Sequence, residues 1–492
     1  MGLGETRASG EPVRTRVVVI GAGFGGIGLG VKLKAAGLDD FVILEKSDSA
    51  GGVWRENRYP GAACDVPSHL YSFSFEPRAD WRRKYADQAD ILDYLIDCTR
   101  KYGLLPHIRF GAEVVEARWD ETSNHWIVRT RAGTIFEAQS LVTATGQLGK
   151  PAIPTLPGLA HFAGPAFHSA QWRSDVDLAG KRVAVIGTGA SAIQFVPAIA
   201  PLAEQLTVFQ RSAAYVLPKP DKLYAGWQLA LFRHIPGALW FSRMVQYLKH
   251  EVTAFAFVTF PSALKVKRPA FRRHLRAGVN DPDVRTRLVP DYRIGCKRIL
   301  LSNDYFQAFD RRNVELVTKS IREIRRDAVI TADGTERKFD CIIFGTGFAA
   351  TDFLVPMTIT GVGGRDLHQA WRNGAEAYLG MTVAGFPNFF MLYGPNTNLS
   401  HNSIIFMLES QIRYVVACLR RLRSARSIAV KQDVQDRFNA RLQQRLRHTV
   451  WAKGCSSWYL TADGRNTTNW PGYTFEFRLK TRAPNWADYA VR

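Results

Sequence analysis

Short apolar runs followed by helical spacing occur twice in this chain, with an offset of 166 residues (187 minus 21). The first copy predicts a strand at Arg16–Ile20, a helix at Phe24–Ala36 and a second strand at Phe41–Glu45. The second copy predicts the same order of elements over Arg182–Arg211. Continuous apolar strands that alternate with helices are typical of a parallel sheet with helices on both faces. The predicted fold class is therefore α/β.

Local patterns predict the other main elements of the chain. An amphipathic helix is expected at Asp90–Tyr102, because its apolar residues recur at helical spacing and Gly103 follows it. A hairpin is expected at His125–Thr130 and Thr134–Phe136, around a turn that contains glycine. The remaining predictions are short strands at Leu141–Thr145, Val314–Val317, Asp340–Phe344 and Asn388–Tyr393, and a helix at Ser403–Arg421.

Changes in composition predict how the chain divides into domains. Residues 150–157 are rich in proline and suit a linker between the two repeats. Residues 224–293 are rich in Phe, Trp, Leu and Arg at helical spacing, which predicts a helical insertion. One strand–helix–strand unit cannot bury its own sheet, so the first domain must resume near the C-terminus. We therefore expect a first domain of 14–149 and 345–492, and a second of 150–220 and 294–344 interrupted by 221–293.

Each repeat carries a glycine-rich turn between its first strand and its helix. The turns are Gly21-Ala-Gly23-Phe-Gly25-Gly26 and Gly187-Thr-Gly189-Ala-Ser-Ala192. Glycines at this spacing allow a tight turn and let the backbone approach a pyrophosphate at the helix N-terminus. The sequence therefore predicts two Rossmann-like nucleotide-binding domains. The alternative is one nucleotide site and one decayed repeat.

The residue 24 positions after the first glycine differs in charge between the repeats. It is Glu45 in the first and Arg211 in the second. A carboxylate at this place binds a ribose diol, whereas a guanidinium accepts a 2′-phosphate. We therefore predict FAD in the first domain and NADPH in the second, with Lys297 as a further phosphate contact. The alternative for Arg211 is an ordinary surface arginine.

Three further segments are candidates for the flavin site. Gly146 ends the strand predicted before it, and Asn396 lies in Gly394-Pro-Asn396-Thr-Asn398 ahead of a predicted helix, where backbone amides could face a cofactor. The third segment is Gly51-Gly52-Val-Trp54-Arg-Glu-Asn-Arg-Tyr59-Pro60-Gly61-Ala-Ala-Cys-Asp65. Its glycines suit a loop that folds over the flavin, Trp54 supplies a flat apolar surface, and Asp65 supplies a carboxylate. The alternative is an ordinary loop.

Composition limits the classes of partner. The net charge of +21 indicates an arginine-rich solvated surface, a polyanion or membrane partner, or steering of anionic ligands. No nucleic-acid module accompanies the charge, so nucleic acid is not expected. In the insertion, the basic residues alternate with Trp and Phe. This pattern predicts either a membrane-facing surface or helices packed on the nucleotide domain.

The cysteines and the N-terminus bear on location. The six cysteines are scattered, with neither a CxxC motif nor metal-ligand spacing, so no metal site is expected. Their spacing is typical of a reducing cytoplasm and argues against a disulfide oxidoreductase. Met1–Thr15 is polar and is expected to be an unstructured leader, and no apolar run is long enough to span a membrane.

Two long motifs resemble fingerprints of the type I Baeyer–Villiger monooxygenases, within the flavin-containing monooxygenase superfamily. Gly51–Asp65 resembles the first, [A/G]GxWxxxx[F/Y]P[G/M]xxxD. Phe162-Ala-Gly164-Pro-Ala-Phe-His168-Ser-Ala-Gln-Trp172 resembles the second, FxGxxxHxxxW followed by Pro or Asp, and departs from it at Arg173. The resemblance extends from about residue 14 to Trp470-Pro471-Gly472.

The resemblance implies an enzyme that uses NADPH, FAD and O2 to insert one oxygen atom next to a ketone carbonyl, through a 4a-peroxyflavin, giving an ester or lactone. It implies Arg298 as the catalytic arginine and Asp65 as its partner, and a small lipophilic ketone as substrate. It associates His168 and Trp172 with coupling between domains. The aromatic segments at 455–459 and 470–472 are expected to line the substrate pocket or to be core.

Three other functions stay open at this point. A flavin monooxygenase that oxidises nitrogen or sulfur is the nearest, and it needs no catalytic arginine. A disulfide reductase and a non-catalytic flavoprotein are the others. Neither the particular ketone nor the oligomeric state follows from the sequence.

Overall fold

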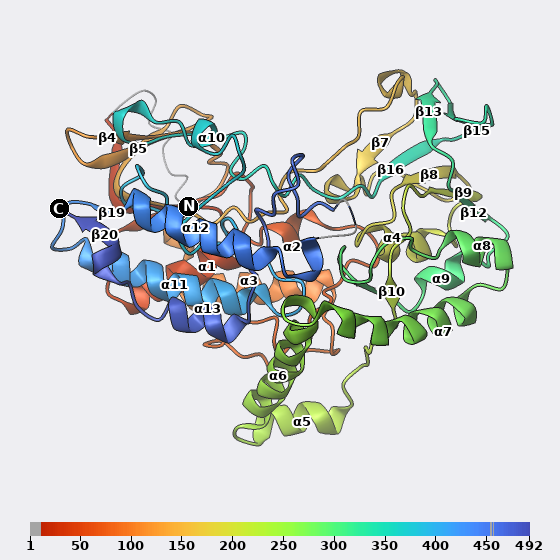
Figure 1. The fold of residues 1–492 in the computed structure, drawn as a ribbon, viewed down its shortest axis with the longest axis horizontal. Coiled ribbons are helices and arrows are strands. Elements are labelled where there is room, and N and C mark those ends of the chain that lie inside the picture. The colour runs from red at the N-terminus through yellow and green to blue at the C-terminus, as the bar shows by residue number, and fades with distance from the viewer. Residues whose placement is uncertain (1–10, 453–454, 456) are drawn as a thin grey trace, which may run out of the picture.

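The computed structural model describes residues 11–452, 455 and 457–492. Figure 1 shows two sheets in separate lobes, with the N-terminal and C-terminal parts of the chain together in one lobe. The first strand begins at Val13, so the predicted leader is wrong for residues 13–15, and residues 1–10 lie outside the described residues. No helix in the described part of the chain is long and apolar enough to cross a membrane.

The first lobe is built on an eight-stranded sheet. Its order is β17-β4-β5-β6-β1-β2-β3, and β18 pairs with β6. The pairings of β1 with β2 and β6, and of β18 with β6, are parallel, whereas β4, β5 and β6 pair antiparallel. The strands are β1 (Val13–Ile20), β2 (Phe41–Leu44), β3 (Ile108–Arg109), β4 (Val114–Asp120), β5 (His125–Thr130), β6 (Ile135–Thr143), β17 (Thr358–Thr360) and β18 (Phe389–Met391).

Both faces of this sheet are covered, which explains its continuous apolar strands. On one face Val17, Val19 and Ile43 pack with helices α1 (Phe24–Ala35), α3 (Gln88–Lys101) and α11 (Ile404–Arg421). On the other face Val18 and Ile20 pack with the aromatic core around Trp126 and Phe389. The first domain therefore does resume near the C-terminus. Its other C-terminal elements are α10 (Leu367–Ala370), β19 (Ile428–Val430), α12 (Gln432–Leu446), α13 (Thr474–Lys480) and β20 (Tyr489–Val491).

The second lobe holds a five-stranded parallel sheet of order β12-β9-β8-β16-β7. A three-stranded antiparallel sheet, β13 (Ile321–Ile324), β14 (Ala328–Thr331) and β15 (Glu336–Lys338), packs beside it and was not predicted. The other elements are β7 (Ala166–His168), β8 (Arg182–Ile186), α4 (Ala192–Ile199), β9 (Gln205–Phe209), α9 (Tyr305–Ala308), β12 (Val314–Val317) and β16 (Cys341–Phe344).

The predicted insertion is helical. It contains α5 (Gly226–His234), α6 (Ala238–Val258), α7 (Arg268–Gly278) and α8 (Pro282–Arg287). The short strands β10 (Val216–Leu217) and β11 (Leu300–Leu301) pair in parallel and close its base. Figure 1 shows α5 and the lower end of α6 projecting away from both sheets.

Most predicted elements appear within three residues of their expected ends, with one instructive error. The short strand predicted at Leu141–Thr145 is the last part of β6, which runs without interruption through 135–143. The polar residues Gln139 and Ser140 interrupt the apolar pattern and hid this continuity, although Ser140 is buried. The exact boundaries of the two domains and of the insertion, which divide the chain into five segments, stay a prediction.

Candidate active site

The first glycine turn folds so tightly that side chains are excluded from it. Gly21 has a φ of +104°, and a Cβ there would lie 2.8 Å from the carbonyl oxygen of Ala144. A Cβ on Gly26 would lie 1.9 Å from the carbonyl oxygen of Gly21. Gly23 is different, since its added Cβ would meet only Gly52, at an ordinary 3.6 Å. The space over Gly23 is therefore free for a ligand, as a pyrophosphate cradle requires.

Glu45 follows β2 directly beside this turn. Its carboxylate is buried and accepts hydrogen bonds from the backbone N–H groups of Ala22, at 2.7 Å, and Ser47, at 3.0 Å. These bonds fix the carboxylate at the end of β2, where a ribose diol is bound in Rossmann-like folds. The first site thus fits an adenine dinucleotide, as predicted.

The segment Gly51–Asp65 returns onto the same turn. The N–H of Gly51 donates to the carbonyl oxygen of Ala22 at 2.9 Å, and Gly52, with a φ of +54°, packs on Gly23. Trp54 lies in the short helix α2 (Val53–Glu56), and its indole N–H donates to the hydroxyl of Tyr71 at 3.2 Å. The first glycine turn and the start of the segment Gly51–Asp65 therefore lie against each other, although they are about thirty residues apart in the sequence.

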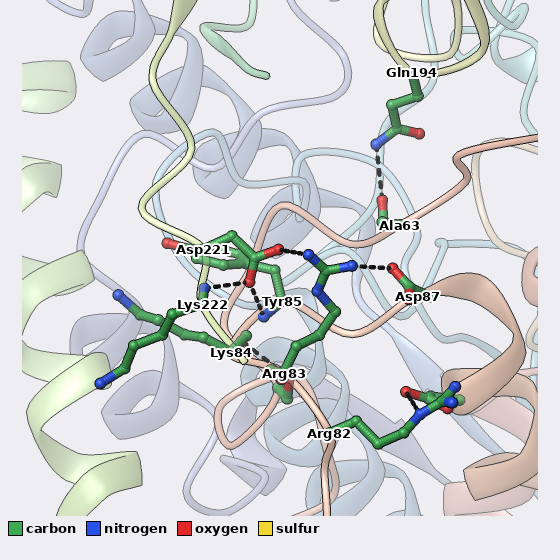
Figure 2. Close-up of polar contacts among 11 residues, drawn as sticks. Ala63, Arg82, Arg83, Lys84, Tyr85, Asp87, Gln194, Asp221 and Lys222 are labelled. Atoms are coloured by element: carbon green, nitrogen blue, oxygen red, sulfur yellow. Dashed lines mark hydrogen bonds and ion pairs between the residues drawn. The ribbon is translucent and has the colours of Figure 1, made fainter. Parts of the chain in front are cut away.

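The far end of this segment joins the two lobes. The hydroxyl of Tyr59 donates to Oε1 of Gln194, and Nε2 of Gln194 donates to the carbonyl oxygen of Ala63, both at 2.9 Å. Gln194 belongs to α4 of the second lobe. Figure 2 shows the Ala63–Gln194 bond together with Arg83, which bridges Asp87 and Asp221. Asp65, two residues after Ala63, is thereby held at the boundary between the lobes.

Arg298 of the second lobe contacts Asp65 there. Its Nε and Nη2 donate to Oδ2 of Asp65 at 3.1 and 2.6 Å. Burial opposes ionisation of Asp65, but the charge and hydrogen bonds of Arg298 outweigh it and hold the pKa of Asp65 below its usual value. The charge of Asp65 in turn raises the pKa of Arg298. The guanidinium is therefore a permanent positive charge whose position Asp65 fixes.

Two tyrosines that the sequence did not single out as catalytic, the half-buried Tyr393 and the buried Tyr459, complete this environment. Burial raises the pKa values of Tyr393 and Tyr459, while the charge of Arg298 opposes the shift, so both hydroxyls stay neutral near the guanidinium. Tyr393 donates to Oδ1 of Asn398 at 2.6 Å, and Tyr459 bonds Ser400 at 3.0 Å. Tyr459 belongs to the aromatic segment expected to be pocket or core, and it is both buried and close to Arg298.

Gln147 is a second residue that the sequence did not indicate. It follows Gly146, which has a φ of +71°, and its Nε2 donates to the carbonyl oxygens of Tyr393 and Gly394, each at 3.1 Å. Its buried Oε1 has no partner among the described residues. An unpartnered buried acceptor is typical of a group that faces a ligand. A cofactor contact of Gly146 itself stays a prediction.

Asn396 connects its own loop to the segment 466–469 through hydrogen bonds. Its backbone N–H donates to the carbonyl oxygen of Thr467 at 2.8 Å, and its Nδ2 donates to those of Asn466 and Asn469. The helix expected after it begins only at Ile404, capped by Ser403. The amide of Asn396 is therefore used within the protein, and any role toward the flavin would come through the position of this loop.

The second glycine turn resembles the first in geometry. Gly187 has a φ of +107°, and a Cβ on it would lie 2.5 Å from the carbonyl oxygen of Gly345. A Cβ on Gly189 would meet that oxygen at 3.4 Å. Arg211 lies exposed at the end of β9. Lys297 donates to the hydroxyl of Ser212 at 2.9 Å.

Arg211 and Lys297 are neighbours. Burial lowers the pKa of Lys297, and the positive charge of Arg211 lowers it further. Two cations held close together form a site for a doubly charged anion such as a 2′-phosphate. The arrangement fits NADPH, as the sequence predicted, and a contact of either residue with the phosphate stays a prediction.

The second fingerprint lies away from the charged pair. His168 ends β7, its Nδ1 accepts from the N–H of Ala170 at 3.1 Å, and its ring packs against Phe348. Trp172 packs between Phe167 and Phe195. Arg173, where the motif departs, pairs with Asp175 at the surface. The motif thus packs on the second sheet beside the segment that returns to the first lobe, and a role in domain coupling stays a prediction.

The structure corrects the prediction made from cysteine spacing. Cys296 and Cys455 form a disulfide across 159 residues, whereas Cys64, Cys98, Cys341 and Cys418 are free and buried. The partners are so far apart in the chain that no spacing rule indicated them. Disulfides persist mainly in oxidising environments, so cysteine spacing alone does not decide the compartment, and the cytoplasmic location stays a prediction. The pair joins the segment that carries Arg298 to the segment that carries Tyr459.

The pairing predicts a thiol count. Denatured protein that has not been reduced is expected to take up four equivalents of an alkylating reagent, and six after reduction, measured by intact mass. A peptide map should find Cys296 and Cys455 as the only unlabelled cysteines in the first sample. Six labelled thiols without reduction would show that the disulfide does not form in solution.

No group of His, Cys, Asp and Glu in the described part of the chain could hold a metal ion. The two nucleotide cradles and the charged pair between them are the groups at this site that could take part in chemistry. Comparison with known proteins identifies that chemistry.

A family model described as flavin-binding monooxygenase-like matches residues 14–358. A Baeyer-Villiger monooxygenase of Streptomyces coelicolor is 46% identical over 480 residues, which are 97% of this chain and 92% of that protein. The chain belongs to the Baeyer–Villiger monooxygenases of this family. A closed crystal structure of cyclohexanone monooxygenase matches with a TM-score of 0.90 at 28% identity, over 98% of this chain and 100% of that one. An oxidised steroid monooxygenase bound to NADP matches with a TM-score of 0.85 at 33% identity, over 97% and 99%.

This membership confirms the predicted fold, enzyme class and cofactors. The chain is a flavin-dependent Baeyer–Villiger monooxygenase with two Rossmann-like domains, one for FAD and one for NADP. Two of the alternatives left open by the sequence, a disulfide reductase and a non-catalytic flavoprotein, do not agree with membership of this enzyme family. The two glycine turns and the residues beside them can therefore be compared with what FAD and NADP require.

Replacing Arg211 with glutamine is expected to reduce kcat/KM for NADPH about ten- to hundredfold, because a charge-assisted hydrogen bond contributes roughly 1.5–3 kcal/mol. NADH lacks the 2′-phosphate, so its kcat/KM should stay unchanged. The measurement is steady-state kinetics with both nucleotides. Arg173→Gln, which removes an exposed arginine paired with Asp175, is the matched control. Equal losses with NADPH and NADH would assign Arg211 a structural role instead.

Proposed function

We propose that this enzyme inserts one oxygen atom of O2 beside the carbonyl of a small lipophilic ketone, with Arg298 as the catalytic residue and Asp65 as the residue that positions it. When bound, NADPH supplies the reducing electrons and FAD activates dioxygen. One oxygen atom enters the ester or lactone and the other leaves as water. The observation that carries the proposal is the contact between Arg298 and Asp65 at the boundary of the two lobes.

The chemical argument rests on charge. Oxygen attack on a ketone carbonyl places negative charge on oxygen, and a nearby guanidinium stabilises that charge without giving up a proton. Asp65 uses one oxygen, Oδ2, for both bonds to Arg298. The remaining three N–H groups of the guanidinium are left for other acceptors. About a third of the Arg298 side chain is accessible, so the group can meet a ligand.

The surroundings favour a lipophilic substrate. The neutral side chains of Tyr393 and Tyr459 interact electrostatically with the guanidinium, and Trp451 and Trp458 pack around Tyr459. Aromatic walls with one fixed charge orient a carbonyl while burying an apolar body. Cyclohexanone and steroid monooxygenases are among the structural relatives, and both names denote cyclic carbon skeletons.

A flavin monooxygenase that oxidises nitrogen or sulfur is the second candidate, because the matching family model is described only as flavin-binding monooxygenase-like and names no substrate. The paired Arg298 and Asp65 favour the ketone reaction, because heteroatom oxygenation needs a protonated oxygen donor and gains nothing from a fixed cation.

Product analysis distinguishes the two. Purified protein loaded with FAD would receive NADPH, isotope-labelled dioxygen and a mixture of linear, cyclic and aromatic ketones, a thioether and a tertiary amine. Gas chromatography with mass spectrometry should find a labelled ester or lactone. A sulfoxide or N-oxide without any ester would favour the second candidate.

A further inference from the structure

Exposed apolar side chains concentrate on the helical insertion. The described residues include 22 large hydrophobic side chains that are exposed, and half of them lie between residues 223 and 266. Five of them lie on α5, at the start of α6 or on the turn between these helices, and we call these five the tip cluster. They are Trp227, Leu231, Ile235, Trp240 and Phe241. Trp227 and Trp240 are 70% and 65% exposed, although tryptophan is usually well buried.

The tip cluster is not needed to hold α5 and α6 in place. Their inner side is anchored to the first lobe through His69, whose ring stacks on Tyr224 and meets Phe232 edge-on. Nδ1 of His69 hydrogen-bonds Ser242 at 2.8 Å, and Arg243 donates to the carbonyl oxygen of His69 at 2.8 Å. The side chains of the tip cluster are exposed and belong to neither of the large hydrophobic cores.

The charge of the insertion is strongly positive, because residues 221–293 contain 13 Lys and Arg residues and five acidic residues. From Lys222 to Asn280 the chain contains ten Lys and Arg residues but a single acidic residue, Glu251. Glu251 is buried and accepts hydrogen bonds from Asn402 and Thr474, so it does not neutralise the surface.

Three lysines gather at the base of the same projection. Lys84 of the first lobe is joined to the entry of the insertion, since its N–H donates to the carbonyl oxygen of Lys222 at 2.9 Å. Burial lowers the pKa of Lys84, and the charges of Lys249 and Lys222 lower it further. None of them has an ion pair in the described part of the chain; the nearby Asp221 pairs with Arg83 instead (Figure 2).

We propose that the tip cluster and the three lysines form a docking surface for the anionic face of a phospholipid bilayer. Tryptophan and phenylalanine partition into the boundary between headgroups and acyl chains, and lysines near that boundary are attracted to anionic headgroups. The protein would bind as a peripheral enzyme, because no described helix crosses the membrane.

The charges favour a bilayer over a second copy of this chain. A symmetric dimer through the tip cluster would bring two copies of the stretch 222–280 together, and this stretch has no exposed acid to pair its ten basic residues. An anionic bilayer instead complements the exposed basic residues of this stretch. The proposal is independent of the particular ketone.

The test is cosedimentation of the FAD-loaded full chain with vesicles. We expect binding to vesicles of phosphatidylcholine mixed with phosphatidylglycerol to be about tenfold stronger or more than to phosphatidylcholine alone. Binding should weaken at high salt. Brominated acyl chains should quench tryptophan fluorescence, and the variant W227F/W240F should lose this quenching.

Two triple variants separate the contributions, each with a matched control. W227S/W240S/F241S should lose vesicle binding, whereas L105S/I153S/L202S, which changes three other exposed apolar residues, should keep it. K84Q/K222Q/K249Q should lose the preference for phosphatidylglycerol, whereas R420Q/R421Q/R423Q, with the same change in net charge, should keep it. All four should retain FAD and NADPH oxidation, which shows that they are folded.

Three results would overturn the proposal. Wild-type protein that fails to bind mixed vesicles would do so directly. Equal losses in the lysine and arginine variants would show that net charge alone drives adsorption. Dimers without vesicles that disappear in W227S/W240S/F241S, measured by mass photometry, would assign the surface to a second copy.

Discussion

Arg298→Ala is expected to lower the rate of ester formation about 10²–10³-fold or more while NADPH still reduces the flavin, because removing one fixed donor to a developing oxyanion costs an enzyme roughly this much. The reduction step needs the two nucleotides close together, but no charge beside the ketone. Stopped-flow absorbance of the flavin and product analysis of the same samples measure the two steps separately.

The companion variants define what Arg298 supplies. Arg298→Lys keeps the charge but loses the planar fork that bonds Asp65 through two nitrogens, so partial recovery is expected. Asp65→Asn keeps the shape of the partner but removes its charge, and should lower ester formation less than Arg298→Ala. Arg325→Ala removes a surface arginine that pairs with Glu323 and Glu336, and it is the control for loss of an ion-paired arginine. Normal ester formation by Arg298→Ala would refute the assignment.

Gly23→Ala is expected to weaken FAD binding roughly a hundredfold, because displacing the pyrophosphate from the backbone amides of the turn forfeits about 3 kcal/mol of charge-assisted hydrogen bonding. The fold has room for the methyl group, since its nearest protein neighbour would be Gly52 at 3.6 Å, and φ is an ordinary −88°. Bound FAD per protein and the Kd for added FAD are the measurements. The Tm of the apoprotein should not change.

Gly226→Ala is the matched control for this prediction. Gly226 begins α5, a Cβ there would meet nothing within 4 Å, and no nucleotide is expected nearby. Gly26→Ala would be a poorer test, because its methyl group would collide with the backbone of Gly21 and disturb the turn itself. An unchanged Kd for FAD in Gly23→Ala would mean that the pyrophosphate does not pass over this glycine.

The site was predictable where its signals are local. Each glycine turn needs only a strand before it and a helix after it, and the charge 24 residues on marks the end of the next strand. Glu45 and Arg211 therefore followed from spacing alone. The role of Arg298 did not, because nothing near it in the chain indicates an acidic partner 233 residues away; it came from a resemblance, and the structure shows the contact.

The sequence by itself determined the α/β class, the two nucleotide cradles and the basic, aromatic insertion, because periodicity and turn chemistry act over a few residues. Only the tertiary structure decided which distant groups meet: Arg298 with Asp65, Cys296 with Cys455, and the three lysines at the base of the insertion. It also decided that Tyr393 and Gln147 flank the site and that the tip cluster faces outward. Such contacts depend on how the lobes pack and on the path of the chain between them, and no local pattern encodes that path.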